Sequence, residues 1–365
     1  MPNHVLPAEV CARIVRHASR SDLPALCRLS KLFQEPAEQK LYQTVYLHDP
    51  LQTERICGSL LAHDGKRAAY IRAINVEVDT RYGRYRPPEQ FWRRISDVFL
   101  KADNLEFAYV VDPETCRPWI LDPSSVHFQL RDCMLPLAWN KHLVAFLQTQ
   151  KQVRSLYVPK VDFIRDNDAT IRRIQPMPPD GLPNLITLEA PLLVATELLS
   201  KPIRHVQAAM DEDGDIFLTF LSQAARSNTT LRSLNVHSVP DFLVSDVLRL
   251  LANSPLSAYM RHIGILHLPL NERNDIHRSL TKFAQLEMLQ LNITHWQAMV
   301  INAPWQTVAM SMQRIAITEL ATYCPTLRLV QFWHGHSKIL WRYENDHWVN
   351  VFTNERPQDT YWRNF

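Results

Sequence analysis

The chain has 365 residues, of which 46% are hydrophobic and 21% charged, a composition typical of a folded globular protein and not of a disordered one. Its 40 basic and 37 acidic residues leave a net charge of only +3, so the overall charge does not predict nucleic-acid binding. Of its 7 glycines, the two nearest, Gly58 and Gly65, stand too far apart for a dinucleotide-binding fingerprint, a P-loop or a nucleophile elbow, whose glycines lie closer together.

Residues 5–47 predict three short helices. In the first, Val10, Ile14 and Ala18 recur every fourth residue, which gives a helix one apolar face. Pro24 begins the second, because proline suits a first helical turn, where its missing N–H has no partner to lose.

The third helix is expected to turn four apolar residues inward: Leu32, Phe33, Ala37 and Leu41. Pro36 stands in its middle, where a proline interrupts the backbone hydrogen bonds unless the helix restarts there.

These residues resemble the F-box, in the form common among fungal F-box proteins. The resemblance rests on LPAEV at 6–10, LCRLSKLF at 26–33 and LYQTVYL at 41–47. It implies a three-helix module that docks on the Skp adaptor of a cullin-RING ubiquitin ligase, while the rest of the chain recruits a substrate protein. It also implies an apolar set that faces the adaptor or forms the module's core: Leu6, Pro7, Val10, Ile14, Leu26, Leu29 and Phe33. The alternative is that these are core residues of a helical cap on the following domain.

From residue 70 onward, apolar residues recur at relative positions one, four and six, as in Leu105, Ala108 and Val110. The pattern begins at nine positions: Ile71, Leu105, Val153, Leu185, Ile203, Leu231, Ile263, Leu286 and Leu327. A short parallel strand followed by a covering helix fits this pattern, and such units stack because none buries its apolar face alone. The intervening stretches 213–228 and 240–255 read as helices. The region resembles the irregular leucine-rich-repeat-like solenoid that follows the F-box in many family members.

Residues 338–352 alternate around Asn345 and Asp346, which predicts a β-hairpin that caps the last repeat. We therefore expect an α/β fold with three parts: an F-box-like module at 1–50, a repeat solenoid at 51–337, and a capping hairpin and tail at 338–365.

The fifth position of each repeat strand is expected to face away from the covering helices and to line a binding surface. These residues are Tyr109, Tyr157, Glu189, Gln207, Asn235, His267, Gln290 and Gln331. A second candidate is the segment 80–94, where Arg81, Arg84 and Arg86 alternate with aromatic residues and suit an acidic or phosphorylated peptide. For both sets the alternative is an ordinary solvated surface without a ligand.

The expected function is substrate recognition in an SCF-type ubiquitin ligase, with the Skp adaptor, the cullin scaffold and an unidentified substrate protein as partners. No catalytic motif is present, so we expect no enzymatic activity. The alternatives are a repeat scaffold outside any ligase and, more remotely, an RNA-binding protein that uses the arginine segment.

The six cysteines are never closer than Cys11 and Cys27, so no paired zinc or redox motif exists, and we expect reduced thiols, no metal and no cofactor. The N-terminal residues lack an apolar signal region, and no run approaches the ~18 apolar residues that span a bilayer. We therefore expect a cytoplasmic or nuclear protein without membrane association.

Overall fold

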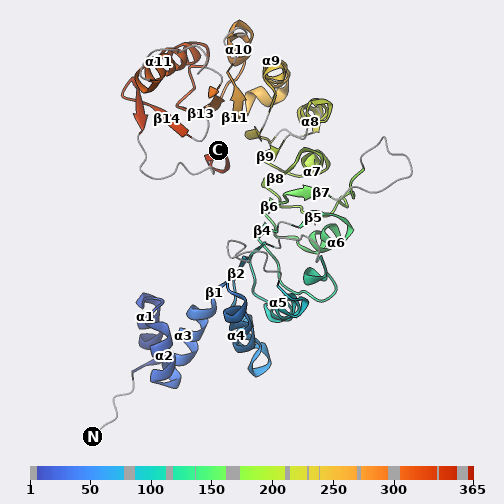
Figure 1. Cartoon of the computed structure of the whole chain (residues 1–365), viewed down its shortest axis with the longest axis vertical. Helices are drawn as coiled ribbons and strands as arrows, with labels where there is room; N and C mark the ends of the chain where they lie inside the picture. Colours follow the sequence, from blue (N-terminus) through green and yellow to red (C-terminus); the bar gives the residue numbers. More distant parts are fainter. Residues whose placement is uncertain are drawn as a thin grey trace. The chain divides into compact units, whose positions relative to one another are not determined.

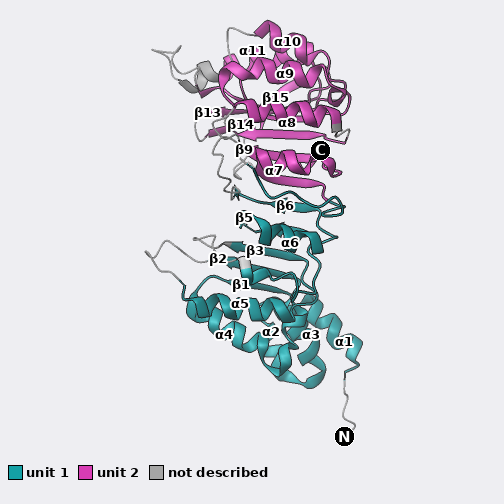
Figure 2. Cartoon of the chain, turned by 90° about the vertical axis from the view of Figure 1, so that its right-hand side faces the viewer, with its two compact units in different colours: residues 1–184 teal, residues 185–365 magenta. Residues whose placement is uncertain are grey.

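The computed structural model describes residues 6–77, 87–111, 118–135, 137–161, 173–209, 214–227, 230–237, 239–268, 273–294, 305–334, 337–351 and 361–365. The chain forms two compact units, residues 1–184 and residues 185–365 (Figure 2). This division does not coincide with the boundaries expected from the sequence, at residues 50 and 337.

Unit 1 begins with three helices, α1 (Ala8–His17), α2 (Leu23–Leu29) and α3 (Lys31–Tyr42). They share a small core of buried Cys11, Val15, Leu23, Phe33 and Ala37, to which Ala18, Leu26, Cys27 and Leu41 add partly buried surface. The helix α3 continues through Pro36 without interruption, so the break that this proline could impose does not occur.

The remainder of unit 1 is a parallel sheet whose strands follow one another in chain order (Figure 1). Its strands are β1 (Thr44–Leu47), β2 (Ala73–Glu77), β3 (Phe107–Val111), β4 (Asp132–Met134) and β6 (Ser155–Tyr157). Two short strands, β5 (Ala138–Trp139) and β7 (Lys160–Val161), pair separately. The helices are α4 (Pro50–Leu61), α5 (Glu89–Lys101), α6 (Lys141–Thr149), and the 3-10 turns η1 (His63–Gly65), η2 (Ala68–Tyr70) and η4 (Pro118–Leu121).

Unit 2 repeats this arrangement with six parallel strands, again in chain order. They are β8 (Thr187–Pro191), β9 (His205–Ala209), β10 (Ser233–His237), β11 (His262–His267), β12 (Met288–Asn292) and β13 (Leu329–His334). The helices are α7 (Leu192–Glu197), α8 (Gly214–Ser227), α9 (Val244–Ala252), α10 (Arg273–Leu280) and α11 (Trp305–Tyr323). The 3-10 turns are η5 (Leu198–Ser200), η6 (Asp241–Leu243), η7 (Pro255–Ala258) and η9 (Tyr361–Arg363).

The apolar pattern at positions one, four and six explains which strand residues meet the helices. In β10 and the residues before it, Leu231, Leu234 and Val236 are at most 2% exposed. Alternate residues of a strand point to opposite faces, so the residues between them face away from the helices. All nine predicted strand positions coincide with strands, and the expected helices at 213–228 and 240–255 are α8 and η6–α9.

The predicted hairpin is confirmed as β14 (Ser337–Glu344) and β15 (His347–Val351), and β14 pairs antiparallel with the last parallel strand, β13. Asn345 and Asp346 both have positive φ, 48° and 64°, the left-handed conformation that a two-residue type I′ turn requires. Within the described parts of the chain, no helix has the length and apolar content needed to cross a bilayer.

Candidate protein-binding surfaces

Large apolar side chains are unusually exposed on the N-terminal helices. Fourteen such side chains are exposed in the described residues, and five of them fall between residues 6 and 32. We call these five the N-terminal apolar set: Leu6, Val10, Ile14, Leu29 and Leu32, with exposed fractions of 40–67%. Several exposed large apolar side chains within so short a segment make it a candidate interaction surface.

The structure separates the seven residues of the F-box resemblance into two groups. Phe33 is buried in the three-helix core and Leu26 packs partly buried against it, whereas Leu6, Pro7, Val10, Ile14 and Leu29 are exposed. Leu32, which we expected to point inward, is 40% exposed. It lies one residue before Phe33, and Phe33 and Ala37 already take the inward positions of α3, so the helical period turns Leu32 outward.

Lys40 on α3 holds α1 in place. Its Nζ donates hydrogen bonds to the carbonyl oxygens of Val15, Arg16 and Ala18, at 3.1, 2.7 and 2.8 Å. A cation at a helix C-terminus stabilises the carbonyls that have no partner within the helix. Val10 and Ile14 of the N-terminal apolar set are therefore carried by a helix whose end is fixed to α3.

A partly buried ion pair joins α3 to the rest of unit 1. Arg67 Nη2 lies 2.8 Å from Glu38 Oε1, and their side chains are only 23% and 12% exposed. The hydrogen bond from Arg67 holds the pKa of Glu38 below its ordinary value.

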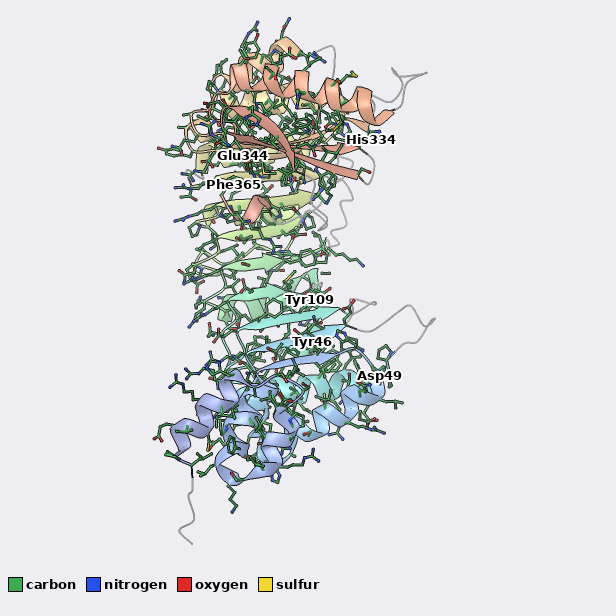
Figure 3. The ribbon with its side chains drawn as sticks, turned by 90° about the vertical axis from the view of Figure 1, so that its left-hand side faces the viewer. Tyr46, Asp49, Tyr109, His334, Glu344 and Phe365 are labelled. Atoms are coloured by element: carbon green, nitrogen blue, oxygen red, sulfur yellow. The ribbon has the colours of Figure 1, made fainter. Side chains whose placement is uncertain are left out.

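The sheet of unit 1 presents one row of aromatic and amide side chains on the face opposite its covering helices. Strand pairing aligns Tyr46, Asn75, Tyr109, Met134 and Tyr157 in register; we call this the tyrosine row. Tyr46 is 48% exposed and the others are intermediate. Figure 3 shows Tyr46 and Tyr109 on this face. Tyr109 and Tyr157 were both expected on this face, and the strand pairing confirms that they share it.

Tyr46 was missed because its strand, β1, was assigned to the F-box resemblance and not to the repeats. The signal was present: Tyr42, Val45 and Leu47 occupy positions one, four and six, which makes Tyr46 a fifth-position residue. Arg20 of the helical part lies over the Tyr46 ring, 5.4 Å from its centre. Burial, aided by the nearby Glu77 charge, raises the pKa of Tyr109.

In unit 2 the corresponding row contains four amide side chains that bond to one another in two pairs. Asn235 Nδ2 donates to Gln207 Oε1 at 3.0 Å, and Gln290 Nε2 donates to Gln331 Oε1 at 2.7 Å. Asn235, Gln290 and Gln331 are only 2–3% exposed. These three predicted substrate-binding side chains are therefore not open to a ligand in this structure, although the side-chain oxygens of Asn235 and Gln290 accept no hydrogen bond from the described residues.

His267 does not belong to this row. A β-bulge between Ile263 and Leu266 shifts the register of β11, and the residue paired with Asn235 is Gly264. A Cβ at Gly264 would stand 2.5 Å from Asn235 Oδ1 and 2.7 Å from Gln290 Oε1. Only glycine leaves space for both amides, and His267 Nδ1 instead lies 2.7 Å from Asp241 Oδ1.

A second row of unit 2, next to the amides, contains two buried histidines. His205, Ser233 and His262 are paired across β9, β10 and β11, and His262 Nδ1 lies 2.8 Å from Ser233 Oγ. Burial lowers the pKa of His205, and it lowers the pKa of His262 to about 3. Both rings are neutral at pH 7.

Arg81, Arg84 and Arg86 lie outside the described residues, so the basic-segment hypothesis stays a prediction. Among the residues that are described, no three His, Cys, Asp or Glu side chains come together as a metal site. Burial raises the pKa of the Cys57 thiol to about 12, and it also raises the pKa values of Cys133 and Cys324. These three thiols are therefore poor nucleophiles.

Comparison of the chain with models of known protein families finds no match. A search of the curated proteins also finds no relative.

Proposed function

We propose that the protein is a substrate-recognition subunit of an SCF-type ubiquitin ligase. In this proposal α1–α3 form an F-box that binds a Skp adaptor, which links the chain to the cullin scaffold. The following repeats form a leucine-rich-repeat-like solenoid that holds the substrate protein. The chain acts by proximity and needs no catalytic residue of its own.

The observation that carries the proposal is the exposure of the N-terminal apolar set. Leu29 is 67% exposed and Leu6 47%, although the three helices have enough core contacts to bury Phe33 and Ala37. Covering a Leu or Ile side chain contributes about 1.5–3 kcal/mol when it passes from full exposure to full burial. Five partly exposed residues of this kind can supply the apolar centre of a protein interface.

The tyrosine row supports the substrate-binding half of the proposal. Tyrosine is enriched in interface cores because it combines a large apolar ring with a hydroxyl group. Tyr46, Tyr109 and Tyr157 come from three strands and share one sheet face.

The test is co-purification of the full chain with a Skp adaptor. The variant Ile14→Glu/Leu29→Glu replaces two exposed apolar side chains with charges and leaves the buried core residues unchanged, so it should stay folded and lose the adaptor. The matched control is Leu51→Glu, at a side chain 72% exposed on α4, which should bind as the wild type does.

Retention of the adaptor by the folded double variant would contradict the assigned surface. A folded wild-type chain that binds no Skp adaptor would favour the alternative, a repeat scaffold in which α1–α3 are a cap.

A further inference from the structure

The segment 361–365 lies on the sheet face of unit 2 that the covering helices leave open. The turn η9 contacts β9 and β10, on the side opposite α7, α8 and α9 (Figure 1). Figure 3 shows Phe365 over the same strands. The face that the repeat pattern marks for substrate binding is thus already occupied by a piece of the chain.

Three specific contacts hold this segment. His205 Nδ1 lies 3.1 Å from the carbonyl oxygen of Trp362, to which it is placed to donate, and the Trp362 side chain is 1% exposed. Arg363 Nη2 donates to Glu189 Oε2 at 3.0 Å. The Phe365 ring stacks on His262, with centres 5.5 Å apart and planes 8° from parallel.

This strand face carries polar groups, which distinguishes it from an apolar face that any apolar segment could bury. His205, Ser233 and His262 are at most 6% exposed, and polar groups are costly to bury unless a partner meets them. A purely apolar segment would leave Glu189 and His205 without a polar partner. A segment with a cation, a free backbone carbonyl and aromatic rings supplies a partner for each of these groups.

The face also has an acceptor that the segment does not fill. Asn235 Oδ1 is buried and accepts no hydrogen bond from the described residues, and it converges with Gln290 Oε1 over Gly264.

We propose that the face formed by β8–β11 is a peptide-binding site, and that residues 361–365 occupy it as an internal ligand. Its partner is a protein segment in which an aromatic residue is followed by arginine or lysine and, two positions after this cation, by a second aromatic residue. This inference rests on the proposed substrate-binding role of the repeats and specifies the chemistry of the substrate. Glu189 recognises the cation, His205 the backbone carbonyl, and His262 the second ring.

Because the internal ligand is tethered, a free peptide competes with it at a disadvantage. The Arg363 and Glu189 side chains remain 33% and 25% exposed, so their pair contributes modestly and the segment can be displaced. Tethering supplies a local concentration on the order of millimolar, which weakens the apparent affinity of a competitor.

The experiment measures binding of a fluorescent pentapeptide, with the sequence of residues 361–365, to the full chain by anisotropy. The variant Trp362→Ala/Phe365→Ala weakens the internal ligand and should bind the peptide about tenfold or more tighter than the wild type does. Adding Glu189→Lys should reduce this binding by about tenfold or more. A peptide with glutamate in place of arginine should restore binding to the variant that carries Glu189→Lys.

The matched control adds Asp246→Lys, at a partly exposed carboxylate on α9, and should leave binding unchanged. If the double variant does not fold, Arg363→Glu replaces it, since this residue is partly exposed and leaves both aromatic rings in place. The peptide with the sequence of residues 361–365 should bind the Arg363→Glu variant more tightly than it binds the wild-type chain.

A folded variant that binds no peptide, or binding that is indifferent to Glu189→Lys, would overturn the inference and make the segment a fixed part of the fold. Retention on the Skp adaptor is measured on the same proteins. Loss of peptide binding with adaptor binding intact rejects this inference alone, whereas peptide binding without adaptor binding rejects the ligase function alone.

Discussion

Acid should destabilise unit 2 through His262. In the unfolded chain this histidine has its ordinary pKa of 6.5, whereas burial lowers the pKa in the folded chain to about 3. Between these values the unfolded state binds a proton that the native state does not. The stabilising contribution is therefore complete above pH 6.5 and is lost as the pH falls from 6.5 towards 3.

The expected magnitude at pH 5 is about 2 kcal/mol, from a gap of roughly 1.5 pH units below 6.5 at about 1.4 kcal/mol per unit. The assay is urea unfolding of the wild type and His262→Asn at pH 7 and pH 5. Asparagine keeps a polar group near Ser233 Oγ but does not titrate, so the variant should lose about 2 kcal/mol less between the two pH values than the wild type loses.

Changing the exposed His142 to asparagine is the control and should leave the pH dependence of the wild type in place. Equal losses for the wild type and His262→Asn would refute the reasoning. They would mean that the His262 ring is hydrated, or that it already carries its proton, when the protein is folded.

Three other substitutions have expected effects on stability. Lys40→Met removes three hydrogen bonds at the end of α1 and should cost about 1–3 kcal/mol; it is checked by faster hydrogen exchange of the α1 amides with no change in unit 2. Gly264→Ala places a Cβ against two buried amide oxygens and should lower the free energy of unfolding by about 1–3 kcal/mol in urea denaturation, so a neutral result would contradict the close approach. Gly58→Ala, where a Cβ meets nothing within 4 Å inside α4, should raise stability in the same assay by about 0.5–1 kcal/mol, and destabilisation would be the opposing outcome.

Much of the sheet was predictable because its parallel strands are buried against helices at regular positions. The missed strand β4 carries the same pattern in Leu130, Cys133 and Leu135, all completely buried, but a cysteine at the central position concealed it. Buried cysteine behaves as a small apolar residue, so counting it as one would have found the strand.

The bulge in β11 explains the misplaced His267. The sequence pattern assigns Ile263 to position one, whereas strand pairing places it opposite Leu234 and Leu289, in position four. An inserted residue in one strand changes the frame of every residue after it. Periodicity alone does not reveal such an insertion.

The occupation of the unit 2 face was beyond sequence reasoning for a different reason. Arg363 and Glu189 are 174 positions apart, and no local pattern connects them. The same is true of Phe365 and His262. Likewise, the period identified the apolar face of α1, but only the packed core showed that Val10 and Ile14 stay exposed while Cys11 and Val15 are covered.

Calorimetric titration of the full chain with a purified Skp adaptor measures adaptor binding directly. We expect one-to-one binding that Ile14→Glu/Leu29→Glu abolishes and that Leu51→Glu leaves intact. Absence of binding by the folded wild type, or equal binding by all three proteins, would contradict the assignment of α1–α3 as an adaptor-binding F-box.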